Sequence, residues 1–352
     1  MESQVMTVYV PILKGRRPQF QALSHVADQD DMRPVIEVEA GERDTDVKQS
    51  VARLAGEVGR RIPDGVGLAF DTAPLARGFG RSAPREALSL LASLLGDLGH
   101  SFRPVIRPGD DPGALGDVRR LVAEHQMGVC LRVDGAYAYR LGEVRPLLEQ
   151  LDAVGVAAER ADVVVDCGYV GSAAGAVTGV AWTVELLLGV PWQSVVVAGG
   201  SFPAPADLRA LPPRRVRSIH RKEAPLWREA ARRWPVGFGD YGVDHPGPPP
   251  EGRPFGPSLR YTVGDDWRLY QWPTDAAGKH STFYDLCRAL RESPDWPRDG
   301  PAFSWGDRCI ELAALGCAGP GGGAQWKAYS LSHHLAAVAR ALENGAPDHG
   351  MS

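Results

Sequence analysis

Short apolar runs recur along the first 245 residues of the chain, and each is separated from the next by a polar, helix-like segment. Strands that are buried on both faces form such continuous runs, which is typical of parallel sheets. Successive runs start roughly 25 to 40 residues apart, enough for a strand, a helix and two short loops. The eight runs are Val8–Leu13, Pro34–Ile36, Val66–Phe70, Phe102–Ile106, Val129–Val133, Val163–Val165, Ser194–Ala198 and Val236–Phe238.

The segments between the runs carry apolar residues at helical spacing. In 45–60, for example, Val47, Val51, Leu54 and Val58 form one stripe. We expect helices over 18–27, 45–60, 84–98, 114–126, 144–158, 177–188 and 224–234. Eight strand–helix units predict a (β/α)8 barrel of the TIM type over residues 1–245. A doubly wound open sheet is the alternative, but it usually has fewer strands, and no GxGxxG motif follows the first run.

A Pro- and Gly-rich segment, 246–257, reads as a linker, and it is followed by a different pattern. Residues 259–263 and 267–272 flank Gly264 and predict a hairpin. Helices are expected over 281–291, with Ser281 as the N-cap, and over 309–315 and 324–342. We therefore expect residues 258–352 to form an α+β extension packed on the barrel.

Composition narrows the class of protein without naming a reaction. The chain is 44% hydrophobic and 23% charged with a net charge of −4, which is ordinary for a soluble globular protein and gives no overall basic field for nucleic acid. No apolar stretch is long enough to span a membrane, and the N-terminus does not resemble a signal peptide. Five cysteines without a CxxC pair fit reduced thiols. We expect a cytoplasmic protein.

Charged residues follow most of the apolar runs, where a barrel of this type places its chemistry. Six carboxylates and three cations are expected to meet at one mouth and to form a polar pocket, although such residues also form ion-pair networks that hold loops. They are Lys14, Glu37, Glu39, Asp71, Arg107, Arg132, Asp134, Asp166 and Asp240. Because the first and last strands are neighbours in a closed barrel, Lys14 and Asp240 are expected to lie side by side.

Two features suggest a phosphate-containing ligand. Gly199, Gly200 and Ser201 follow the seventh run, where barrel enzymes often bind phosphate through backbone N–H groups. Arg221 is expected to clamp the same anion, although the glycines also suit a tight turn that needs positive φ. Carboxylates beside cations suit acid–base catalysis or a Mg²⁺ site, and the cofactor is otherwise unknown, since the zinc, Walker A and GxSxG motifs are absent.

Several short motifs, taken in order, resemble the bacterial and phage Beta protein family. The resemblance runs from about residue 8 to about residue 340, with Gln19 where the family tends to have an acidic residue and Ser332 where it tends to have asparagine. It implies no particular reaction; its usual genomic surroundings suggest host–phage conflict. The resemblance supports a functional role for Glu223, as a partner of Arg221, and for Tyr241 and Asp307. The motifs are Tyr9–Lys14, Ser201–Pro203, Arg221–Glu223 with Leu226 and Trp227, Phe238–Tyr241, Arg260–Thr262, Trp267, Phe303–Ser304, Gly306–Asp307, Trp326 and His333–His334.

Three functions remain open. The first is an enzyme, a hydrolase or lyase, acting on a phosphate-containing small molecule or nucleotide. The catalytic residues would be Glu37, Asp71, Asp166 and Asp240. The substrate would be bound by the three mouth cations Lys14, Arg107 and Arg132, and by Gly199, Gly200, Ser201, Arg221, Glu223 and Tyr241. The second is a non-catalytic ligand sensor whose extension binds a protein partner. The third is a nucleic-acid-binding or nuclease component that uses the nine Lys and Arg residues between 209 and 233.

Overall fold

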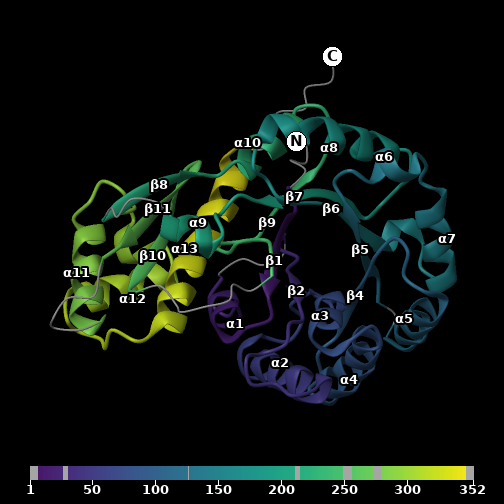
Figure 1. Ribbon diagram of the computed structural model, residues 1–352, viewed down its shortest axis with the longest axis horizontal. Helices are drawn as coiled ribbons and strands as arrows, with labels where there is room; N and C mark the ends of the chain where they lie inside the picture. Colours follow the sequence, from purple (N-terminus) through teal and green to yellow (C-terminus); the bar gives the residue numbers. More distant parts are fainter. Residues whose placement is uncertain are drawn as a thin grey trace, which may run out of the picture.

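Eight parallel strands close into a barrel, in the order β1-β2-β3-β4-β5-β6-β7-β9 (Figure 1). The computed structural model describes residues 7–26, 31–125, 127–210, 215–248, 256–272 and 279–345. All eight predicted strands are present, so the predicted TIM-type barrel is confirmed. They are β1 (Tyr9–Lys14), β2 (Val35–Glu37), β3 (Leu68–Asp71), β4 (Phe102–Ile106), β5 (Val129–Asp134), β6 (Ala161–Tyr169), β7 (Ser194–Gly200) and β9 (Gly237–Asp240).

Helices surround the barrel, and the seven predicted helices are all found with small shifts at their ends (Figure 1). The second starts at Val47 because the Asp46 carboxylate caps it, accepting from the Gln49 backbone N–H at 2.8 Å. The barrel helices are α1 (Arg17–Leu23), α2 (Val47–Arg61), α3 (Ala76–Phe79), α4 (Ala83–Asp97), α5 (Pro112–His125), α6 (Tyr137–Leu141), α7 (Arg145–Val154), α8 (Ala173–Leu187) and α10 (Glu223–Ala231), with 3₁₀ turns at Ala73–Leu75 and Ala158–Arg160.

Alternate residues of each strand fill the barrel interior. The interior cluster includes Val10, Ile12, Val35, Ala69, Cys130, Val164, Val196 and Ala198. On β9 the interior positions are glycines: a Cβ on Gly239 would lie 2.6 Å from the Ala198 Cβ. The large residue of this strand, Phe238, packs outward against Trp227 and Tyr9. The barrel is therefore narrow beside β9, and only the residue after this strand, Tyr241, projects a large side chain inward.

The extension forms a second sheet that takes one strand from the barrel segment of the sequence. The predicted hairpin is present as β10 (Ser258–Val263) and β11 (Asp266–Gln271), with Gly264 at a φ of 56° in the turn. β8 (Val216–His220) was not predicted; it follows β7 and the short helix α9 (Pro205–Ala210), and it pairs antiparallel with β11. Residues 216–220 thus belong by pairing to the extension, although they precede the predicted boundary at residue 245.

Three helices complete the extension: α11 (Lys279–Arg291), α12 (Trp305–Ala314), which follows a 3₁₀ turn at Gly300–Ala302, and α13 (Gly323–Gly345). Ser281 lies inside α11 and is not its N-cap. α13 packs against both β10 and α1, and its residues Leu331 and Leu335 join the barrel's outer core (Figure 1). Most of the predicted linker lies outside the described residues. Among the helices that the structure describes, none is long and apolar enough to cross a membrane.

Candidate functional site

The carboxyl ends of five strands bring a charged network together at the mouth of the barrel. Arg132, from β5, lies at its centre and is 4% exposed. Its Nη1 donates to Glu37 Oε1 at 2.9 Å and to Asp71 Oδ2 at 2.6 Å, and its Nε and Nη2 donate to Asp166 Oδ2 at 3.0 and 2.7 Å. A planar guanidinium is suited to this task because its fixed fork of donors reaches carboxylates on both sides.

Two further side chains complete this network, which we call the mouth network. The Tyr241 hydroxyl accepts from Arg132 Nη2 at 2.7 Å and donates to Asp166 at 2.8 Å. Arg107, which directly follows β4, donates through Nη2 to Asp71. The sequence-predicted residues Glu37, Asp71, Arg107, Arg132, Asp166 and Tyr241 are therefore in one connected cluster.

The protein environment shifts the pKa values of two carboxyl groups in this network, Glu37 and Asp71, in opposite directions. Burial raises the pKa of Glu37 more than Arg132 and Lys14 lower it. Burial also favours the neutral form of Asp71, but the two arginines beside it outweigh that effect and hold its pKa below the ordinary value. For Arg132, burial is outweighed by Asp166 and the other acidic neighbours, so its pKa is raised and it stays charged.

Arg107 is the cation of the mouth network that is most open to an incoming group. Its side chain is 36% exposed, and its Nε is buried without a hydrogen-bond partner. It lines a crevice of about 60 Å³ together with Asp71, Thr72 and Asp110. Burial raises the pKa of Asp110, so this neighbour opposes an incoming anion less than an ordinary carboxylate would.

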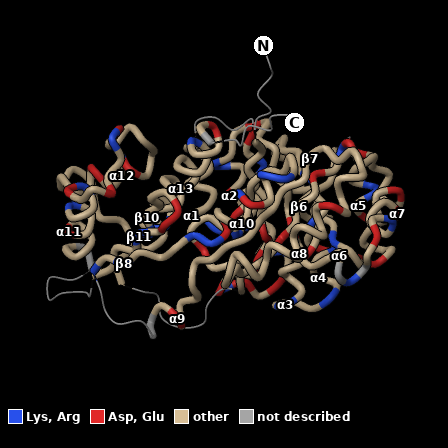
Figure 2. Tube along the Cα trace, turned by 90° about the horizontal axis from the view of Figure 1, so that it is seen from above, with Lys and Arg blue, Asp and Glu red and all other residues tan. Residues whose placement is uncertain are grey.

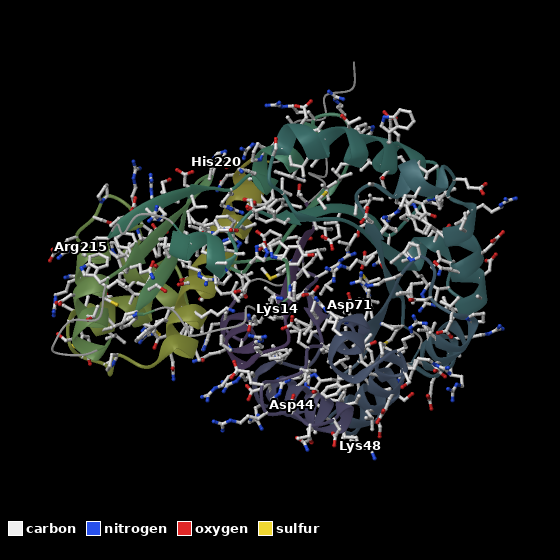
Figure 3. All side chains as sticks on the ribbon, viewed as in Figure 1. Lys14, Asp44, Lys48, Asp71, Arg215 and His220 are labelled. Carbon is white, nitrogen blue, oxygen red and sulfur yellow. The ribbon has the colours of Figure 1, made fainter. Side chains whose placement is uncertain are left out.

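Lys14 lies at the edge of the mouth, on the side of the extension. Its Nζ donates to Glu39 Oε1 and to the Gly247 carbonyl, both at 2.9 Å, and lies 3.8 Å from Glu37 Oε2. Figure 3 labels Asp71 within the ring of strands and Lys14 on the side of the ring that faces the extension. Lys14, Glu37, Glu39 and Asp71 therefore lie together at the mouth, whereas Asp134, which was expected there too, is half-exposed and pairs with Arg140 at 3.3 Å.

Asp240 does not lie beside Lys14 in the mouth, so that expectation was wrong. It pairs in register with Pro11 of β1, but its side chain leaves the barrel on the outer face, beneath the extension. Its Oδ1 accepts from the Tyr9 hydroxyl at 2.9 Å, and its Oδ2 accepts from His334 Nε2 at 2.8 Å and from Arg221 Nη2 at 3.3 Å. The reason is strand alternation: Tyr241 takes the inward position, so Asp240 must face outward.

The glycines that were predicted to bind phosphate are part of a strand and do not form an open loop. Gly199 and Gly200 belong to β7, where Gly199 pairs with Asp240 and the Gly200 carbonyl accepts from Val170 N–H. Neither glycine has positive φ; a Cβ on Gly200 would lie 2.8 Å from Pro246, so this residue is small because of close packing. These positions correct both readings of the glycines, as a phosphate loop and as a tight turn.

Arg221 is buried away from the mouth, with two carboxylates and an aromatic ring around it. Its Nε donates to Glu223 Oε1 at 3.1 Å, and its guanidinium lies 5.7 Å from the centre of the Trp267 ring. Ser201 Oγ donates to Glu223 Oε2 at 2.6 Å. Glu223 is thus next to Arg221 as expected, but this group holds the extension against β7 and β9, and Arg221 is not placed to bind a ligand with Lys14.

The paired histidines of α13 also join this buried region, which the sequence reasoning did not anticipate. His334 Nδ1 lies 2.8 Å from Thr262 Oγ1, and His333 lies 2.9 Å from Asp307 Oδ2 and 2.8 Å from the Thr262 carbonyl. Tyr261 donates to Asp307 at 2.5 Å. The only signal in the sequence was that these residues fall on the motifs of the family resemblance.

The charges of the mouth are not arranged around a vacant metal position. Within the described ranges, no three His, Cys, Asp or Glu side chains come together in a way that would hold a metal ion. The carboxylates of the mouth network converge instead on the Arg132 guanidinium. The described residues of the mouth therefore do not fit a Mg²⁺ site.

Several residues of the arginine-rich stretch are paired within the protein. Arg228 pairs with Asp265, and Arg232 and Arg233 both pair with Glu229. Figure 2 shows Lys and Arg interspersed with Asp and Glu over the barrel and the extension. These ion pairs occupy part of the stretch, and the nucleic-acid-binding function stays a prediction.

Comparison with known proteins places the chain in one family. The family model described as Beta protein matches residues 9–340. No curated protein matches. Among solved structures, the chain is similar to a mutant tryptophan synthase alpha-subunit from the hyperthermophile Pyrococcus furiosus, with 14% sequence identity, a TM-score of 0.25, and coverage of 55% of this chain and 88% of that chain. That likeness carries no argument about function; the barrel assignment stands on the pairing of the strands.

Proposed function

The chain belongs to the Beta protein family, and on that premise we propose that its barrel mouth binds and turns over a small molecule that carries a phosphate-type anion. The observation that carries the proposal is the pair Glu37 and Asp71. Both carboxyl groups bond to one nitrogen of Arg132, and their pKa values are moved apart, upward for Glu37 and downward for Asp71. Such a separation is the physical basis for assigning an acid and its ionised partner in an active site.

In this proposal the residues of the mouth network have distinct roles. Glu37 is assigned as the acid that donates to a leaving group, because its pKa is the one that burial raises, while Asp71, whose pKa is lowered, stays ionised and fixes Arg132 and Arg107. Arg107 takes the anion of the ligand, because its guanidinium has an exposed side and one buried nitrogen without a partner. Tyr241 and Arg132 hold Asp166 at the rim. The reaction class is that of a hydrolase or lyase.

The test begins with mass spectrometry of small molecules that copurify with the protein, with and without added Mg²⁺. Phosphate-containing compounds found in this way are then titrated into the wild type, Arg107→Gln and Glu37→Gln, with exposed Arg145→Gln on α7 as the matched control. We expect Arg107→Gln to weaken binding by about tenfold or more, and Glu37→Gln to bind without forming product. Unchanged turnover in Glu37→Gln would contradict the assignment of the acid.

A ligand sensor is the second candidate, and the position of β9 favours it. Asp240 and Tyr241 are consecutive, yet one bonds to the extension and the other to the mouth network. A ligand at the mouth is therefore one residue away from the contacts that hold the extension, which would be the part that meets a protein partner. In this case ligand binding changes the protease sensitivity of the extension, and the wild type forms no product. The five cysteines are free thiols, and the cytoplasmic location stays a prediction. The role in host–phage conflict that the family resemblance implies stays a prediction.

A further inference from the structure

Four cationic side chains meet where the extension packs against the barrel. Lys14 is the last residue of β1, Arg16 precedes α1, Arg260 lies on β10 and Lys327 lies on α13. Figure 1 shows α13 alongside α1 at this seam, and the two helices are in contact. We call these four residues, with the carboxylates of Glu39 and Asp244, the seam cluster.

The two carboxylates of the seam cluster are each shared by two cations. Glu39 accepts from Lys14 Nζ and Arg16 Nη2, both at 2.9 Å. Asp244 Oδ1 lies 2.7 Å from Lys327 Nζ and 3.3 Å from Arg260 Nη1. The cluster therefore joins barrel residues to extension residues through ion pairs that are mostly shielded from solvent.

The seam cluster has more positive than negative charge. Over the part of the chain that the structure describes, the other carboxylate within ion-pair distance of these four cations is Glu37, at 3.8 Å from Lys14. Glu37 is not counted in the seam cluster, because it is bonded to Arg132 in the mouth network. The seam cluster itself therefore holds four cations and two carboxylates. Burial lowers the pKa of the Lys327 ammonium, and the nearby charges of Arg260 and Arg16 lower it further. Together they outweigh the opposite effect of Asp244.

The cluster has donors left for a ligand and one buried acceptor. The side chains of Arg16 and Lys327 are 36% and 25% exposed, so both can be reached from solvent. Gln19, which is fully buried, donates to Asp244 Oδ2 at 3.0 Å, and its Oε1 has no hydrogen-bond partner. A buried acceptor of this kind is costly unless a hydroxyl or water donates to it.

We propose that the seam cluster is a binding site for a dianionic phosphate group, held between Arg16 of the barrel and Lys327 of the extension. Hydrogen phosphate matches the site in two ways: its two negative charges balance the excess of two cations, and its hydroxyl can donate to Gln19. The inference goes beyond the proposed function, because it requires neither Glu37 acidity nor any ligand at Arg107. Its consequence is that phosphate stabilises the contact between extension and barrel.

The test is calorimetric titration of inorganic phosphate into the full chain at neutral pH, with thermal unfolding measured in parallel against sodium chloride of equal ionic strength. The variants are Lys327→Met, which keeps most of the apolar stem, and Arg16→Gln, which leaves Glu39 paired with Lys14. Lys48→Met is the matched control, because Lys48 is an exposed lysine on α2 and lies at the outer edge of the barrel in Figure 3.

We expect saturable phosphate binding and a rise in Tm for the wild type and Lys48→Met. Affinity should fall by about tenfold or more in Lys327→Met and in Arg16→Gln, because each loses one charged donor. Sulfate, another tetrahedral dianion, should compete. The proposal is overturned if phosphate has no effect beyond that of sodium chloride, or if both variants, folded by circular dichroism, bind phosphate as the wild type does. Activity at the mouth plays no part in this readout, so the two proposals can fail separately.

Discussion

Asp240 and Tyr241 are adjacent in the chain, yet their side chains bond on opposite faces of the barrel wall. Asp240 Oδ2 accepts from His334 Nε2 at 2.8 Å on the outer face, beneath α13. The Tyr241 hydroxyl accepts from Arg132 Nη2 at 2.7 Å in the mouth. The end of β9 therefore connects the polar network of the mouth to the buried polar contacts of the extension.

Substitutions at these two positions should have separate effects. Asp240→Asn removes the charge that Arg221 and His334 share, so we expect faster hydrogen exchange in α13 and in β10. Tyr241→Phe removes only the hydroxyl beside Asp166 and Arg132, and exchange in α13 should stay as in the wild type. The measurement is hydrogen exchange resolved by peptide. Equal effects of the two variants on α13 would show that the two faces are not independent.

Arg132→Met should be among the most destabilising single substitutions at the mouth. It leaves Glu37, Asp71 and Asp166 close together without the cation that they share. Removing one partner of a buried ion pair typically costs about 3 to 5 kcal/mol. Urea unfolding at neutral pH measures the loss, and Arg145→Met, at an exposed pair with Glu143, is the control that should change stability little. A loss as small as that of the control would mean that the network does not support the fold.

The barrel could be predicted from the sequence because its strands are buried on both faces, which leaves continuous apolar runs. β8 could not be predicted in this way, because it has no continuous apolar run. Its side chains alternate between exposed and half-buried, it lies among arginines, and its partner β11 begins 46 residues after its end, Asp266 against His220. No local pattern can show a pairing of that kind.

The sequence predicted which residues lie near the mouth, but not the direction in which every side chain points. Strand ends identify which charges are near the mouth, and Glu37, Asp71 and Arg132 meet there. For β9 the inward positions are Gly237 and Gly239, and the large Phe238 faces outward, so the apolar residue misled the assignment of Asp240. Which cation pairs with which carboxylate depends on side chains that are far apart in sequence.

Asp244 should make the protein lose stability in acid. Burial raises its pKa, but Lys327 and Arg260 outweigh that effect and hold it at about 2. This value is below the unfolded value of about 3.9, so the ionised form favours folding. The contribution is complete above about pH 4 and is lost as the pH falls towards 2.

The comparison that isolates this contribution is between the wild type and Asp244→Asn. The wild type should be the more stable at pH 7, and the difference in unfolding free energy should shrink by about 1 kcal/mol at pH 3, since protonation of Asp244 then removes part of its advantage. Urea titrations at the two pH values give this difference directly, and other carboxyl groups cancel because both proteins carry them. A difference that does not change with pH would contradict the lowered pKa.

Gly239→Ala should destabilise the barrel, while Gly116→Ala should stabilise it. A Cβ on Gly239 would lie 2.6 Å from the Ala198 Cβ and 3.0 Å from the Val10 carbonyl oxygen, and neither atom belongs to a flexible side chain that can move aside. Overpacking of this kind costs about 1 to 3 kcal/mol. Gly116 lies in α5, and a Cβ there would have no atom within 4 Å, so alanine should add about 0.5 to 1 kcal/mol through helix propensity. Thermal and urea unfolding of both variants measure the two signs. Equal stability of Gly239→Ala and the wild type would show that β7 and β9 can separate, and that the glycines of β9 are not required for closure of the barrel.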